Sequence, residues 1–144
     1  MGRDTARALA DRGHSVYATT HKAPQAELFK AERPDVEAFK LDITDATDRH
    51  ILADLAIDVL VNNAAIGESG SLAEVPLERI RATFETNLFA TLALTQVALK
   101  DMIARGSGTV NFISSLAGGR RGPLPRPDAM TQGARTRTTN APLE

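Results

Sequence analysis

The chain lacks cysteine, long apolar runs and an excess of charge of either sign. Without cysteine there are no disulfides and no thiolate chemistry, which favours a cytoplasmic location. No apolar run approaches the ~20 residues that span a bilayer, and residues 1–4 lack the apolar core of a signal peptide. A formal net charge of -1 argues against nucleic acid or an anionic membrane as a partner. No set of metal ligands is predicted.

The periodicity of apolar residues predicts alternating helices and strands. Residues 36–42 alternate with period two, residues 57–62 form a nearly continuous apolar run, and residues 76–105 repeat apolar side chains every three or four positions. Residues 21–34 are polar and predict a loop with one helical turn at 25–30. Helices are predicted at 3–12, from 44 or 45 to 56, and at 76–105, and strands at 14–20, 36–42, 57–62 and 109–114.

This order of elements predicts a partial Rossmann-type α/β fold with a doubly wound parallel sheet. Residues 1–118 would form one domain, since 144 residues are about one domain long. Residues 119–144 are rich in Arg, Pro, Gly and Thr without periodicity, and predict a disordered tail. A weaker hypothesis makes this tail an anion-binding segment through its arginines, Arg120, Arg121, Arg126, Arg135 and Arg137.

Three polar motifs accompany these elements. Asn-Asn-Ala-Ala at residues 62–65 follows a strand, where amides can link neighbouring backbone and small residues leave room for a ribose. Asn87 lies inside the long predicted helix, where its amide competes with backbone hydrogen bonds. Ser114-Ser115 follows the fourth predicted strand. In this order and spacing, the motifs resemble those of the short-chain dehydrogenase/reductase family, in the middle of the family's domain.

The resemblance implies a fold without its first, central strand and without the C-terminal strands. In the doubly wound order 3-2-1-4-5-6 the first strand separates the second from the fourth. The four predicted strands would correspond to strands 2, 3, 4 and 5 of that order. The chain is therefore expected to be a truncated member of the family at both ends.

The resemblance also implies a nicotinamide dinucleotide cofactor. Gly2 aligns with the last glycine of the turn that brings backbone close to the pyrophosphate. Asp42 and Ile43 align with the pair beside the adenine, although Asp42 also suits an ordinary turn. Asn63, with Ala64 and Ala65 after it, would lie beside a cofactor ribose.

The residues near position 20 bear on the choice between NAD and NADP. An acidic residue about 20 positions after the glycine turn binds the 2′-hydroxyl of NAD. Thr20 occupies that place and is neutral, and His21 and Lys22 follow it. This pattern favours NADP, whereas the alternative makes His21 and Lys22 part of a solvated loop.

The catalytic positions of the family are only partly matched. Asn87 aligns with the asparagine of a proton relay, and Ser115 aligns with the serine that binds the substrate carbonyl. The family's Tyr-x-x-x-Lys pair is replaced by Asp128 and Gln132. Tyr17, the one tyrosine of the chain, belongs to a predicted strand and cannot replace it.

Two functions remain open on these residues. The first is an NADP-dependent oxidoreductase that exchanges hydride with a small alcohol or ketone and is impaired or inactive in this chain. The second is a non-catalytic pseudoenzyme or gene fragment, which at most binds nucleotide or pairs with another subunit. In either case the helix at 76–105 is a candidate surface for a homo-oligomer. The loss of the Tyr-x-x-x-Lys pair can also have abolished cofactor binding.

Overall fold

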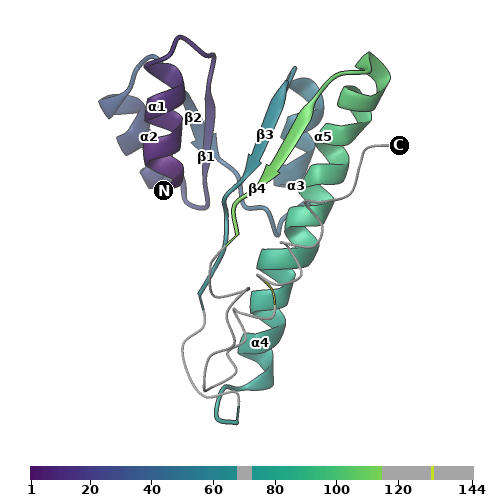
Figure 1. Cartoon of the computed structure of the whole chain (residues 1–144). Helices are drawn as coiled ribbons and strands as arrows, with labels where there is room; N and C mark the ends of the chain where they lie inside the picture. The colour runs from purple at the N-terminus through teal and green to yellow at the C-terminus, as the bar shows by residue number, and fades with distance from the viewer. Residues whose placement is uncertain (68–72, 115–130, 132–144) are drawn as a thin grey trace. The chain divides into compact units, whose positions relative to one another are not determined.

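The computed structural model describes residues 1–67, 73–114 and 131 (Figure 1). Contacts between residues divide the chain into two compact units, Met1–Ile51 and Leu52–Glu144. The predicted boundary between a domain at 1–118 and a tail at 119–144 lies among residues outside those described, so it stays a prediction.

The first unit pairs two parallel strands and covers them with helices. Its elements are α1 (Gly2–Ala10), β1 (Tyr17–Thr20), α2 (Ala23–Glu32), β2 (Glu37–Lys40) and α3 (Ala46–Arg49). Tyr17 pairs with Glu37, and Thr20 pairs with Lys40. The buried core consists of small and apolar side chains from α2, β2 and the turn between them, Ala26, Phe29, Val36 and Ala38.

The predicted loop at 21–34 is wrong, because α2 is a helix of 10 residues. Pro24 lies in its first turn, a position that suits proline because the amide there needs no helical partner. Ala26 and Phe29, three residues apart, form the buried face. Two buried residues are too few to give a clear helical period in the sequence.

The predicted helix from 44 or 45 to 56 is also corrected. Asp45 does cap a helix, since its side chain accepts a hydrogen bond from the amide of Thr47 at 2.7 Å. The α-helical part, however, ends at Arg49. A 3-10 segment, η1 (His50–Asp54), continues the chain.

The second unit places a long helix against another pair of parallel strands, β3 (Val59–Asn62) and β4 (Thr109–Phe112). The helix has three consecutive segments: α4 (Leu77–Phe84), a π-helical segment η2 (Glu85–Ala90) and α5 (Thr91–Arg105). Gly106 ends α5 in the left-handed region with φ 66°, where glycine carries no Cβ penalty.

The strand pairing confirms the predicted partial doubly wound α/β fold. Both pairs are parallel, β1 with β2 and β3 with β4. Within the described part of the chain, no strand joins β1 to β3. In a doubly wound sheet these two would be the neighbours of the first, central strand.

The buried face of the long helix is not the apolar stripe that the sequence suggested. Leu77 is 53% exposed, and Ile80 and Phe84 are only half-buried. The buried positions are mostly small or polar: Thr83, Asn87, Ala90, Thr91, Leu94, Thr95, Ala98 and Met102. Threonine tolerates this burial because its hydroxyl bonds backbone within the helix, as Thr95 Oγ1 does to the carbonyl of Thr91 at 2.8 Å.

Gly108 is a position where we expect any side chain to be costly. A Cβ there would meet Cγ of Met102 at 2.4 Å and Cβ of Met102 at 2.7 Å, and Met102 is buried. Gly108→Ala should therefore lower the free energy of unfolding by about 1–3 kcal/mol through overpacking. Urea unfolding measures it, with Gly67→Ala as the control because a Cβ there meets nothing within 4 Å. Equal stability of the two variants would contradict the prediction.

Candidate functional site

The carboxyl ends of β1 and β2 bring several predicted cofactor residues together. Thr20 is the last residue of β1, and the ladder continues past it because the amide of Leu41 donates to its carbonyl at 2.8 Å. His21 follows β1 and Asp42 follows β2. Their side chains meet, with Nδ1 of His21 3.3 Å from Oδ2 of Asp42.

Asp42 is held by a network of its own. Its Oδ1 accepts from the amide of Thr44 at 2.9 Å and from the hydroxyl of Thr44 at 2.7 Å. Its amide donates to Oδ2 of Asp48 at 2.7 Å. These hydrogen bonds from Thr44, aided by the charges of His21 and Lys40, lower the pKa of Asp42 against the opposing effect of burial. Asp42 is therefore a fixed carboxylate near neutral pH.

Gly2 and Ile43 occupy different environments in the first unit. Gly2 is the first residue of α1, as a glycine before a phosphate-binding helix would be. Ile43 is 8% exposed, and its carbonyl accepts from Nη1 of Arg49 at 2.7 Å. Its side chain thus belongs to the packed interior, and a direct cofactor contact by either residue stays a prediction.

The carboxyl ends of β3 and β4 form a second edge. Asn62 is 4% exposed, and its Nδ2 donates to Oγ1 of Thr95 at 3.0 Å, which ties β3 to α5. The amide of Ile113 donates to the carbonyl of Asn62 at 2.9 Å. Because parallel strands end together, residues 63–65 and Ser114 leave the sheet at the same edge.

Asn87 is the best defined of the predicted catalytic residues. It is fully buried, and its Oδ1 accepts from the amide of Ile66 at 2.8 Å. Its Nδ2 donates to the carbonyl of Ile66 at 2.9 Å and to Oγ1 of Thr131 at 3.2 Å. The side chain therefore fastens the segment after β3 to the helix, which the relay role alone did not predict.

The π-helical segment around Asn87 was missed by the sequence analysis. Segments of this kind are rare, and are often found at functional sites because they displace backbone groups from the regular helix pattern. Thr91 Oγ1 donates to the carbonyl of Thr86 at 3.1 Å, five residues earlier. The buried asparagine in a helix interior was the available sequence signal.

The remaining catalytic candidates, Ser115, Asp128 and Gln132, lie outside the described residues. Thr131 stands between the last two in sequence, and it is described: it is fully buried beside Asn87. The sequence analysis did not single it out. The contact is between Asn87 and Thr131 alone, and the places of Asp128 and Gln132 stay predictions.

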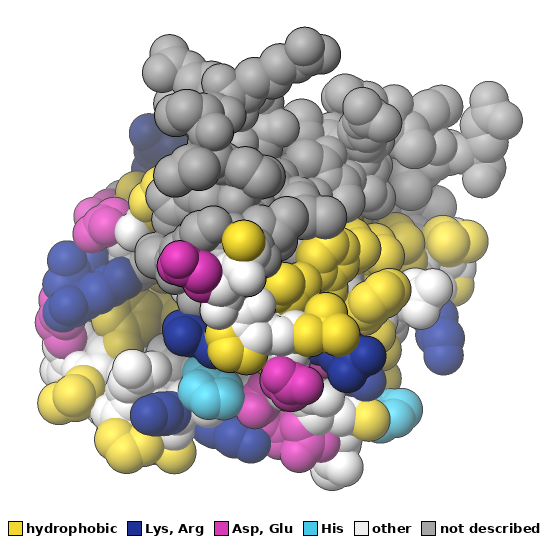
Figure 2. Space-filling view, turned by 90° about the horizontal axis from the view of Figure 1, so that it is seen from below, with side chains coloured by type: hydrophobic (Ala, Val, Ile, Leu, Met, Phe, Trp, Pro, Cys, Tyr) yellow, Lys and Arg dark blue, Asp and Glu magenta, His cyan; other side chains and the backbone are white. Residues whose placement is uncertain are grey.

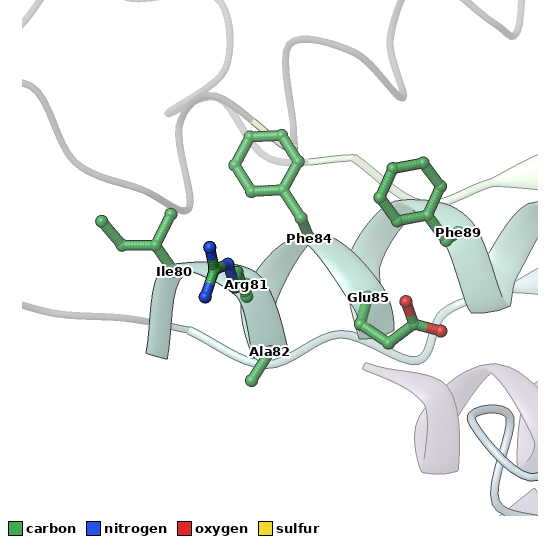
Figure 3. Close-up of a pocket in the computed structure, with 6 residues that line it drawn as sticks. All are labelled: Ile80, Arg81, Ala82, Phe84, Glu85 and Phe89. Atoms are coloured by element: carbon green, nitrogen blue, oxygen red, sulfur yellow. The ribbon is translucent and has the colours of Figure 1, made fainter. Parts of the chain in front are cut away.

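A shallow hollow lies on the long helix. Its lining is mostly apolar and comes from α4 and η2: Ile80, Arg81, Ala82, Phe84, Glu85 and Phe89. The rings of Phe84 and Phe89 extend from the same side of the helix (Figure 3). Among the residues that the structure describes, no predicted cofactor or catalytic residue lines it.

The charged side chains of the described surface are mixed in sign. Figure 2 shows acidic, basic and histidine side chains intermingled on one face, beside apolar patches. Within the described ranges, no three His, Asp or Glu side chains gather as metal ligands would. No helix in those ranges has the length and apolar character of a membrane span.

Comparison with known proteins identifies the family. Residues 1–126 match the short chain dehydrogenase family. An uncharacterized oxidoreductase of Myxococcus xanthus is 35% identical over 130 residues, which cover 83% of this chain and 51% of that protein. The L-xylulose reductase of Mesocricetus auratus is 33% identical, with 83% and 50% covered. The chain thus spans about half the length of the curated relatives it matches.

A solved structure supports the same assignment. A gluconate 5-dehydrogenase of Burkholderia cenocepacia, in complex with NADP and tartrate, superposes with a TM-score of 0.80 at 28% identity. The match covers 93% of this chain and 56% of that one. With its parallel strand pairs and its in-register asparagine motifs, the chain belongs to the short-chain dehydrogenase family.

Proposed function

We propose that this chain binds a nicotinamide dinucleotide, with NADP preferred over NAD, and derives from an oxidoreductase that exchanges hydride with a small alcohol or ketone. The observation that carries the proposal is the buried Asn87, hydrogen-bonded to the backbone that follows residues 62–65. This bond joins the predicted ribose-binding segment to the predicted catalytic helix. The cofactor, when bound, supplies or accepts the hydride.

Other residues of this chain would bind the cofactor and the substrate. In the first unit, His21 and Asp42 suit an adenosine. In the second unit, taken by itself, residues 63–65 suit a ribose. Ser115 would hold the substrate carbonyl. The preference for NADP rests on the neutral Thr20 and on the imidazole after it, and one neighbour of known structure contains NADP.

We place the defect of this chain at proton transfer. A tyrosine hydroxyl gives its proton to the carbonyl oxygen as hydride arrives, and a neighbouring lysine lowers the pKa of such a phenol. An aspartate at position 128 is ordinarily ionised near pH 7, so it has no proton to give. Gln132 brings no charge to hold a ribose hydroxyl or to tune its neighbour.

A non-catalytic function is the second proposal, and the hollow on the long helix favours it. Phe89 is 57% exposed, and with Ile80 and Phe84 it lines the apolar part of this hollow (Figure 3). Such a surface suits pairing with another subunit through helix 76–105. In this case the chain is a pseudoenzyme. Both proposals place it in the cytoplasm, with neither nucleic acid nor membrane as partner.

A titration with NADPH tests whether this chain still binds a nucleotide. We expect the fluorescence of NADPH to change saturably as the protein is added. Ala65→Phe should weaken binding by about 10-fold or more, because an aromatic ring would fill the space beside Asn63, and tenfold corresponds to ~1.4 kcal/mol.

The matched control is Ala104→Phe, because Ala104 is exposed on α5. It should bind NADPH as the unaltered chain does. Absence of NADPH binding to the unaltered chain would overturn the proposal of a nucleotide site, and equal binding by the Ala65 variant would place the site elsewhere.

A further inference from the structure

The imidazole of His21 and the carboxylate of Asp42 form a pair between two strand ends. Nδ1 of His21 lies 3.3 Å from Oδ2 of Asp42, and the two side chains are 66% and 23% exposed. The pairing of Thr20 with Lys40 fixes the two strand ends side by side. The pair thus occupies the strand edge that receives an adenosine ribose in doubly wound folds.

The other charged groups near this pair are mostly engaged already. Lys40, on β2, makes an ion pair with Asp48. Arg49, on α3, donates to the carbonyl of Ile43. The carboxylate of Asp45 caps α3 through the amide of Thr47. Among these groups, His21 is the one that approaches the second oxygen of Asp42.

Two positive contributions remain on the His21 side of the pair. Lys22 follows His21 directly and is exposed. The helix α2 begins at Ala23, and a helix N-terminus carries a partial positive charge. When His21 is neutral, the Asp42 carboxylate opposes these contributions. When His21 is protonated, it neutralises that carboxylate.

We infer that the His21–Asp42 pair selects between the 2′-phosphate and 2′-hydroxyl forms of the cofactor according to the charge on His21. The inference rests on the proposed nucleotide site. A charged imidazole pairs with a phosphate dianion and masks Asp42, so the 2′-phosphate is favoured. A neutral imidazole leaves the charge of Asp42, beside the adenine, uncompensated near a 2′-phosphate, and the preference for that phosphate falls.

The sign of the pH dependence follows from the imidazole. A histidine side chain changes charge between about pH 5 and pH 8, so lowering the pH should raise the affinity for NADPH relative to NADH. The phosphate acts in the opposite sense, because its own second pKa is about 6 and acid removes part of its charge. A rise in the ratio therefore points to a group on the protein.

The test is the ratio of NADPH affinity to NADH affinity, measured by fluorescence titration on the full chain at about pH 6.5 and about pH 8. We expect the ratio to be about 3- to 10-fold higher at the lower pH, as suits a partly exposed charge pair. His21→Gln should abolish this rise. Adenosine 2′,5′-bisphosphate against adenosine 5′-monophosphate should repeat the pattern without the nicotinamide.

Two control variants identify the group responsible. His14→Gln removes another exposed histidine and should leave the rise intact. Lys22→Gln should lower the NADPH preference by a similar factor at both pH values. A ratio that does not change with pH, or that still rises in His21→Gln, overturns this inference while the nucleotide site stands. Failure of both nucleotides to bind overturns the site and the inference together.

Discussion

The double variant Asp128→Tyr with Gln132→Lys is expected to reduce a ketone with NADPH at least about 100-fold faster than the unaltered chain, because general acid catalysis contributes ~10²–10⁴-fold. The tyrosine supplies the proton, and the lysine lowers the pKa of its hydroxyl. Thr131, between the two positions in sequence, is buried against Asn87. The family resemblance is what assigns both positions to proton transfer. NADPH consumption with a panel of small ketones, including ketoses, gives the rate.

The matched control replaces the tyrosine by phenylalanine. Asp128→Phe with Gln132→Lys presents the same ring without the hydroxyl, and should remain as slow as the unaltered chain. Each single substitution should recover little, because groups that act as a unit are far from additive. Equal rates for the Tyr and Phe variants would show that proton donation is not the missing step. No gain in a Tyr–Lys variant that still binds NADPH would reject the proposed register.

Asn87→Leu is expected to lower the free energy of unfolding by about 2–3 kcal/mol. Leucine has a similar volume but no hydrogen-bonding atoms. The amide and carbonyl of Ile66 would each lose a hydrogen bond to Asn87, and so would the buried hydroxyl of Thr131. Thr131→Val removes one of these bonds and should cost about 1 kcal/mol. Urea unfolding, followed by circular dichroism, measures both losses.

The control for Asn87→Leu and Thr131→Val is Gln96→Ala, on the same long helix as Asn87. Gln96 is exposed, so its loss should change the stability by no more than about 0.5 kcal/mol. If Asn87→Leu is as stable as Gln96→Ala, the bonds to Ile66 do not hold the segment after β3. Asn87 would then be available for the relay role that the family resemblance implied.

Strand positions and the capping of α3 were predictable because they depend on local chemistry. Strands at 36–42 and 57–62 follow from alternating or continuous apolar residues, and the structure has β2 and β3 within them. Asp45 caps α3 as its residue type predicts. Helix α2 was not predictable in the same way, because its buried face consists of only Ala26 and Phe29.

The candidate site also has some features that the sequence predicts and others that only the structure shows. The sequence alone indicated the family, because residues 62–65, Asn87 and the serine pair stand at fixed spacings. It also predicts that Asp128 and Gln132 replace the proton-transfer pair. Only the tertiary structure decided that Asn87 binds the backbone of Ile66 and that His21 meets Asp42. Both contacts join residues 21 positions apart in the chain. A periodic pattern indicates which face of an element a residue occupies, but not which distant atoms it contacts.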